Sequence, residues 1–180
     1  MKHVLIVVDM QTDFVDGALG TPEAVAILEN VTAKIKSYAA DSDGVIFVTY
    51  DTHTEDYTTT SEGKHLPVPH CIKGTAGWEL HPTVAAALEG VAYTPVEKPT
   101  FGSVALPALV KEAAAGEDFA VELIGLCTDI CVVSNTLLLK ANFPEISISV
   151  DAACCAGVTP ETHKAALTTM GMCQIEVKNG

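Results

Sequence analysis

The sequence predicts an α/β fold: a doubly wound, mostly parallel, six-stranded sheet with helices on both faces. Six short runs are apolar and mostly continuous rather than alternating, as in parallel strands that are covered on both faces. Segments with apolar residues at helical spacing separate these runs. The chain has 180 residues, 48% of them hydrophobic, and shows neither an internal repeat nor a linker. We therefore expect a single three-layer domain over 1–180.

The first half of the chain begins with "HVLIVVD", which is typical of a buried strand. Thr21 and Pro22 then indicate a helix start, with the threonine as cap and the proline in the first position. A later stretch is polar and rich in Thr, His, Pro and Gly. The expected elements are a strand over 3–9, a helix over 21–40, a strand over 44–51, the polar stretch over 51–80, a helix over 82–90 and a strand over 91–98.

The second half repeats this alternation. "VALPALVKEAAA" predicts a helix that starts either at its first residue or only at Pro107. "FAVELIGL" is typical of a strand, and the helical pattern "DICVVSNTLLLKAN" follows it after a short turn. The expected elements are a helix over 104–115, a strand over 119–126, a helix over 129–142, a strand over 145–152, a helix over 159–172 and a strand over 173–178.

Composition excludes several classes of function. The net charge of −13 disfavours nucleic acid and anionic membranes as partners, since both attract Lys and Arg. No apolar run approaches the ~18–20 residues of a transmembrane helix, and the N-terminal run is too short for a signal peptide. We therefore expect a cytoplasmic protein whose six cysteines are core residues or catalysts rather than disulfides. No GxGxxG motif follows the first strand, which counts against a dinucleotide site.

Chemically active side chains stand where the predicted strands end, the edge at which such sheets carry their sites. Cys131 lies just after the strand 119–126, and a helix cap at Thr128 or Asp129 would place it in the first helical turn. Free N–H groups there stabilise a thiolate and could receive an oxyanion. The alternatives are that Cys127 and Cys131 are small core residues or, less favoured by their spacing, a metal clip.

Two further strand ends strengthen the nucleophile hypothesis. Asp9 closes the first strand and Lys98 the strand 91–98. Each is ordinary alone, as a turn residue and a solvated charge. Together with Cys131 they would supply a base, a cation that holds the sulfur as an anion, and a nucleophile. The set predicts cleavage of an amide without a Ser-His-Asp triad.

The polar stretch contains candidate metal ligands. Asp51 and His53 are two residues apart, so in an extended segment both side chains point the same way. His70 follows later, with Glu62 between. Two imidazoles and a carboxylate suit one divalent ion, Zn²⁺ first, with Fe²⁺ or Mn²⁺ as alternatives. The competing interpretation is a polar loop with solvent-exposed histidines.

The motifs taken in order resemble the isochorismatase-like cysteine hydrolases, and within them the nicotinamidases (pyrazinamidases). The resemblance covers nearly the whole chain and rests on "VDMQTDF", "DTH", "PHCIKGTAGWELHP", "EKPTFGS", "GLCTDICV" and "VDAACCAG". It implies a Rossmann-like three-layer fold and a catalytic triad of Asp9, Lys98 and Cys131. This sequence departs from the family pattern at Cys127, where Ala is common, and at Trp78, where Arg is frequent.

The resemblance also implies the rest of the site. A metal would be held by Asp51, His53 and His70, with Glu62 as a further ligand, directly or through water. A cis peptide would precede Cys127, and the N–H groups of Cys127 and Cys131 would form the oxyanion hole. The aromatic residues expected in the substrate pocket are Phe14, Phe101 and Trp78.

The function that this resemblance implies is hydrolysis of nicotinamide, and of pyrazinamide-like carboxamides, to nicotinate and ammonia through a Cys131 thioester, in NAD salvage. The partner would be this small molecule, and association into a homo-oligomer is compatible with the chain length. One alternative is a cysteine hydrolase of the same fold that acts on another amide or carbamoyl group. The other is a non-catalytic metal-binding α/β protein.

Overall fold

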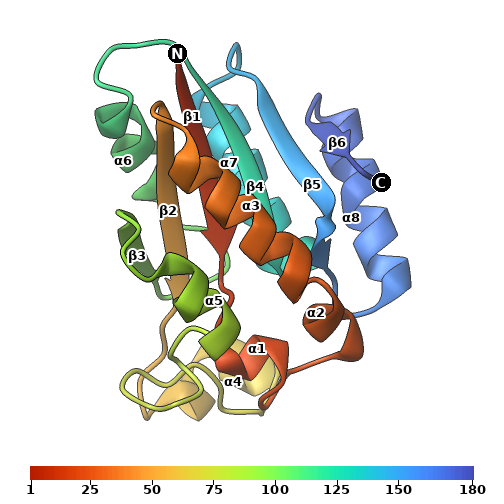
Figure 1. The fold of residues 1–180 in the computed structure, drawn as a ribbon. Helices are drawn as coiled ribbons and strands as arrows, with labels where there is room; N and C mark the ends of the chain where they lie inside the picture. Colours follow the sequence, from red (N-terminus) through yellow and green to blue (C-terminus); the bar gives the residue numbers. More distant parts are fainter.

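A computed structural model describes residues 1–180 and confirms the α/β class. Six strands form one sheet in the order β3-β2-β1-β4-β5-β6 (Figure 1). Every neighbouring pair is parallel, so the sheet is fully rather than mostly parallel. The strands are β1 (Lys2–Val8), β2 (Gly44–Asp51), β3 (Thr94–Lys98), β4 (Phe119–Leu126), β5 (Ile148–Ala156) and β6 (Glu176–Lys178).

Helices cover both faces of the sheet, and each face has its own apolar core. Leu5 and Val7 of β1 face the core beneath α2, α3 and α5, whereas Val4, Ile6 and Val8 face the core beneath α6, α7 and α8. No helix is both long and apolar enough to cross a membrane. The helices are α1 (Thr12–Val15), α2 (Pro22–Ala26), α3 (Leu28–Ala40), α4 (Ser61–His65), α5 (Pro82–Leu88), α6 (Leu106–Ala113), α7 (Val133–Asn142) and α8 (Pro160–Met172).

Several boundaries differ from the sequence prediction. The helix expected over 21–40 is divided at Ile27 into α2 and α3, although the Thr21 hydroxyl caps its start as expected, accepting from the Ala24 N–H at 3.1 Å. The stretch 51–80, for which no element was predicted, contains α4 and the 3₁₀ turn η1 (Tyr57–Thr59). β5 runs on to Ala156 because a register shift lets its small residues continue pairing with β4.

A buried polar network lies on the α3 face of the sheet, in the middle of β4 and β5 rather than at their carboxyl ends. Lys34 of α3 places its Nζ 3.1 Å from Glu122 Oε2 and 2.8 Å from Asp151 Oδ2, and Asn179 donates to Asp151 Oδ1 at 3.0 Å. Burial opposes ionisation of Asp151, but these hydrogen bonds and the Lys34 charge outweigh it and lower the Asp151 pKa.

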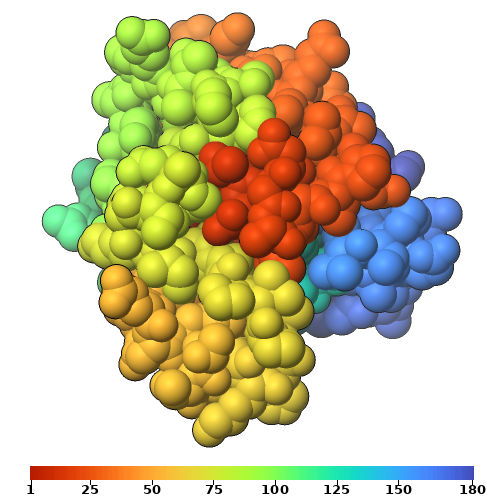
Figure 2. Space-filling view, turned by 90° about the horizontal axis from the view of Figure 1, so that it is seen from below, coloured from red at the N-terminus to blue at the C-terminus, as the bar shows by residue number.

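The carboxyl ends of the strands form the functional edge. The chain winds from β1 outward to β2 and β3, and then from β4 outward to β5 and β6, so the connections diverge between β1 and β4. Figure 2 looks onto this edge. The segment around α1 (red) and the stretch 51–80 (yellow) meet at its centre, beside the start of α8 (blue).

Candidate active site

The structure brings Asp9, Lys98 and Cys131 together at this edge, fully or almost fully buried. The Lys98 Nζ lies 2.6 Å from Asp9 Oδ2 and 3.5 Å from Cys131 Sγ. Asp9 follows β1 directly and has φ of 47°, a left-handed conformation that ends the strand in a sharp turn. Thr49 of β2 donates its hydroxyl to Asp9 Oδ1 at 2.6 Å, which fixes the carboxylate.

The protonation state expected for Cys131 is corrected by this geometry. Burial raises the pKa of the Cys131 thiol well above its usual value, and the Asp9 carboxylate raises it further, against the opposing charge of Lys98. Burial likewise raises the Asp9 pKa, while Lys98 opposes the rise. The sequence indicates a cation and a helix start beside the sulfur, but it does not indicate that the sulfur is buried. Burial and the neighbouring carboxylate therefore favour a neutral Cys131 thiol beside a group able to take its proton.

The turn that carries Cys131 is a π-helical turn, η2 (Thr128–Val132), which leads into α7. The peptide bond Leu126–Cys127 is cis, as the resemblance implied. The cap is Cys127 rather than Thr128 or Asp129, so that part of the prediction is wrong, but Cys131 does lie in the first turn. The Asp129 carboxylate instead accepts from the N–H of Val158 at 3.1 and 3.2 Å.

Asn135, which the sequence analysis did not single out, holds this turn against the Lys98 segment. Its Nδ2 donates to the carbonyl of Cys131 at 2.8 Å and to that of Phe101 at 3.1 Å. Its Oδ1 accepts from the Ser103 N–H at 2.9 Å. Asn135 is buried in α7, one helical turn after Cys131, and its amide is the only clue that the sequence offers.

A second cluster lies beside the first. Asp51, His53, Glu62 and His70 each offer a ligand atom, and these atoms all lie within 4.8 Å of one another. The Nε2 of His53 lies 2.9 Å from Asp51 Oδ2, and that of His70 lies 3.6 Å from both Asp51 Oδ2 and Glu62 Oε1. β2 supplies Asp51 and α4 supplies Glu62, while the two histidines come from the segments flanking α4.

The donor set fits a divalent metal ion. The buried Nε2 of His53 lies near Asp51 Oδ2 but forms no hydrogen bond, as expected of a nitrogen whose lone pair serves an ion. The Nδ1–H of His70 donates to the Val68 carbonyl at 2.8 Å, which leaves its Nε2 free for the cluster. Burial lowers the His70 pKa, but the nearby Asp51 and Glu62 carboxylates, each 3.6 Å from its Nε2, outweigh burial and raise this pKa to about 10. Carboxylates that favour positive charge on a neighbouring imidazole would equally favour a bound cation.

Gln11 fixes the backbone of Asp51. The sequence pattern gave it no role, although it belongs to the motif "VDMQTDF". Its Oε1 accepts from the Asp51 N–H at 2.8 Å, and its Nε2 donates to the Asp51 carbonyl at 2.9 Å and to the Trp78 carbonyl at 2.8 Å. Asp13 acts similarly, accepting from the Cys71 N–H at 2.8 Å beside His70. These two side chains set the positions of ligands from separate segments.

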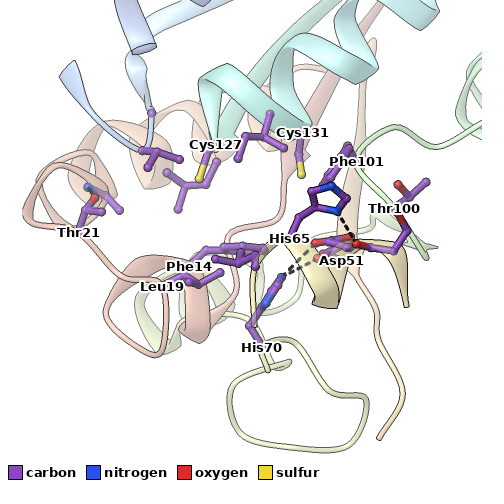
Figure 3. A pocket seen from close by; sticks show the side chains of 18 residues that line it. Phe14, Leu19, Thr21, Asp51, His65, His70, Thr100, Phe101, Cys127 and Cys131 are labelled. Carbon is purple, nitrogen blue, oxygen red and sulfur yellow. Dashed lines mark hydrogen bonds and ion pairs between the residues drawn. The ribbon is translucent and has the colours of Figure 1, made fainter. Parts of the chain in front are cut away.

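Both clusters open into one cavity of about 670 Å³ (Figure 3). Phe14 and Phe101 line it, as predicted. Trp78 does not: its Nε1–H donates to the Thr52 hydroxyl at 2.9 Å, and its ring packs on Tyr50 at 5.5 Å between centroids. The expectation that Trp78 contacts the substrate is therefore wrong, because these contacts keep its ring among the loop residues. His65 of α4 lines the cavity as well.

Lys98 connects the two clusters. Its Nζ lies 3.3 Å from Asp51 Oδ1 as well as 2.6 Å from Asp9 Oδ2, because Asp51 and Lys98 are register partners on β2 and β3. Burial alone would lower the pKa of Lys98, but the negative charges around it raise this pKa, so Lys98 stays an ammonium.

The chain is similar to known proteins over nearly its whole length. Over 187 aligned residues the chain is 28% identical to the nicotinamidase/pyrazinamidase of Mycobacterium tuberculosis (strain ATCC 25618 / H37Rv), covering 97% of both chains. The crystal structure of Bacillus subtilis nicotinamidase/pyrazinamidase PncA superposes with a TM-score of 0.85 at 26% identity, covering 99% of this chain and 100% of that one. The pyrazinamidase of Pyrococcus horikoshii, solved in complex with zinc, has a TM-score of 0.80 at 24% identity, with 98% of each chain covered. Residues 3–178 match the isochorismatase domain, and the chain therefore belongs to the isochorismatase family.

Proposed function

We propose that this protein is a nicotinamidase, which hydrolyses nicotinamide and pyrazinamide-like carboxamides to nicotinate and ammonia in NAD salvage. The observation that carries the proposal is the joining of two sites in one cavity: a buried Asp9–Lys98–Cys131 cluster and, through Lys98, a four-residue metal-ligand cluster. The M. tuberculosis and B. subtilis relatives are named for this activity.

Cys131 is the nucleophile and Asp9 the proton acceptor. As the sulfur attacks the carboxamide carbon, Asp9 takes the thiol proton and then passes it to the departing nitrogen, which leaves as ammonia. The raised pKa of Asp9 makes it a stronger proton acceptor than an ordinary aspartate. A water molecule then cleaves the thioester and releases nicotinate. Lys98 stays charged throughout, pairing with Asp9 and stabilising negative charge on the sulfur.

The backbone N–H groups of Cys127 and Cys131 form the proposed oxyanion hole. Cys127 caps the π-helical turn that follows the cis peptide and Cys131 lies within it, where the amide dipoles favour negative charge. Phe14 and Phe101 hold the aromatic ring of the substrate between them.

The metal ion would be held by Asp51, His53, Glu62 and His70. Bound there, a divalent ion would supply a Lewis acid for the heteroaromatic ring nitrogen, which distinguishes pyridine and pyrazine carboxamides from other amides. Zinc is the expected ion because of the donor set and the zinc complex of the P. horikoshii relative; iron or manganese would fit the same donors.

The experiment that tests the proposal combines metal analysis of the purified protein with an assay of nicotinate formation. Cys131→Ala should abolish turnover while leaving nicotinamide binding measurable by calorimetry. Cys173→Ala, the same change at an exposed cysteine outside the cavity, is the matched control and should keep full activity. Turnover retained in Cys131→Ala would refute the covalent route. Activity on carbamoyl compounds but not on nicotinamide would favour the related cysteine hydrolases instead.

A further inference from the structure

We propose that the cavity contains a second subsite, which is apolar and lies away from the metal cluster. It accepts an apolar group attached to the aromatic carboxamide on the side that faces away from the metal. We call this subsite the outer lobe, lined by Leu19, Thr21, Ala24, Gly157 and Val158. The inference rests on the proposed function, because that function places the ring and the amide of the substrate. It enlarges the substrate class from nicotinamide itself to alkyl-extended aryl carboxamides.

The order of the strands shows how far the cavity reaches. The metal cluster lies at the end of β2, Cys131 follows β4, and Gly157 and Val158 follow β5. From β2 to β5 there are three strand spacings of about 4.8 Å, roughly 14 Å in all. A substrate that occupies the space between the metal cluster and Cys131 leaves the β5 end of the cavity open.

The close view supports this elongated shape. In Figure 3, Thr21 and Leu19 lie on the far side of Phe14 and Cys127 from Asp51. The volume of about 670 Å³ is in the range that encloses drug-sized ligands, which is far more than one six-membered ring and a carboxamide fill.

The chemistry of the outer lobe selects an apolar group. None of its five lining residues is charged, and the single side-chain hydroxyl, that of Thr21, already accepts a hydrogen bond as the cap of α2. By contrast, the metal end of the cavity carries carboxylates and imidazoles. A polar extension would lose its water in the outer lobe and find at most the Thr21 hydroxyl as a side-chain partner, whereas an alkyl group gains from burial.

The walls of the outer lobe are preformed. The Val158 N–H donates to both carboxylate oxygens of Asp129, and the hydroxyl of Thr128 lies 2.8 Å from His163 Nδ1, so the start of α8 is tied to η2. On the opposite side, the Leu19 N–H donates to the Asp13 carbonyl at 2.8 Å. A subsite on fixed walls costs little ordering when a ligand binds.

The alkyl group could be attached at either of two positions, and the products tell them apart. Hydrolysis of a ring-alkylated nicotinamide gives the alkylnicotinate and ammonia. Hydrolysis of an N-alkyl nicotinamide gives nicotinate and the alkylamine. In both reactions one water is consumed and the same carbon–nitrogen bond breaks, so chromatography of the acid product follows either series.

The test compares Val158→Trp, which fills the outer lobe, with Val25→Trp as a matched control. Both valines are about half exposed, but only Val158 lines the cavity. For wild-type protein and Val25→Trp, we expect kcat/KM of the better alkyl series to exceed that of nicotinamide by about tenfold per buried methylene. Val158→Trp should remove this advantage and change nicotinamide turnover less than twofold.

Binding of the same amides to Cys131→Ala protein, measured by calorimetry, gives a readout without turnover. If the alkyl series binds more tightly than nicotinamide and Val158→Trp abolishes this difference, the outer lobe is supported. This holds even if nicotinamide is not hydrolysed. Failure to hydrolyse nicotinamide would refute the proposed function alone. If neither alkyl series binds more tightly or reacts faster than nicotinamide, or if both tryptophan variants act alike, the outer lobe is refuted.

Discussion

Replacement of Gln11 by leucine should weaken metal binding without touching any metal ligand. Gln11 is fully buried and gives three hydrogen bonds to backbone groups, two of them to Asp51. Leucine has a similar volume but makes none of these bonds. Asp51 would then sit at the end of β2 with its N–H and carbonyl released, free to turn its carboxylate away from His53 and from Lys98.

The magnitude follows from these contacts. Three buried hydrogen bonds at about 1 kcal/mol each give a loss of about 3 kcal/mol in the free energy of unfolding. For a chain of this size, that corresponds to a Tm lower by roughly 6–12 °C. Loss of a side chain that positions a ligand typically weakens metal affinity about 10–100-fold. Gln11→Glu should be worse than Gln11→Leu, because a carboxylate would face two carbonyl oxygens.

The assay is a competition titration of zinc between the protein and a chromophoric chelator, with Tm measured on the same metal-free samples. Turnover by Gln11→Leu should be low at limiting zinc and should recover in excess zinc, since the catalytic cluster is intact. If Tm falls but zinc affinity stays within twofold of wild type, Gln11 supports the fold only, and the inference that it positions Asp51 is refuted.

Three further predictions concern charge and burial. Lys98→Met should abolish turnover and lower the free energy of unfolding in urea by about 3–5 kcal/mol, because two carboxylates lose their buried partner. As a control, Lys73→Met removes an exposed ion pair and should lower the same free energy by less than about 1 kcal/mol. The folded-state pKa of Asp151 is lowered, so the contribution of this carboxylate to stability is present above its unfolded pKa of about 3.9 and is lost as pH falls further. Asp151→Asn should therefore flatten the acid limb of a curve of unfolding free energy against pH. An unchanged acid limb would contradict this. Iodoacetamide at pH 8 should modify the exposed Cys173 before Cys131, as mapped by peptide mass spectrometry, because the buried Cys131 thiol has a raised pKa; early modification of Cys131 would show a resting thiolate.

The main features of the fold and site were predictable from local patterns. Continuous apolar runs identify parallel strands, and parallel strands bring their carboxyl ends to one edge. For that reason the sequence alone predicts that Asp9, Lys98 and Cys131 lie close together. The histidines on the polar stretch were predictable only as candidates. Their convergence depends on how that stretch folds, and no periodicity encodes this.

The parts that could not be predicted depend on contacts between distant segments. Gln11 reaches Asp51 and Asn135 reaches Phe101 across loops whose paths no local pattern sets. Trp78 was assigned to the pocket by its place in a motif, but its partner Thr52 lies on another segment and holds it elsewhere. The ionisation of Cys131 is hard to predict for a related reason: a sequence pattern can indicate a nearby charge, whereas burial is a property of the whole fold.

The charges at the centre of the site explain why a neutral resting thiol suits the proposed chemistry. Lys98 is one ammonium that contacts two buried carboxylates, Asp9 and Asp51, as well as the sulfur of Cys131. A thiolate beside the Asp9 carboxylate would be a second negative charge next to the same ammonium, in surroundings that water does not screen. Moving the proton from sulfur to Asp9 keeps the total charge constant, because the carboxylate becomes neutral as the sulfur becomes negative. The nucleophile therefore forms only as the proton is transferred, and Lys98 stabilises whichever of the two atoms carries the charge.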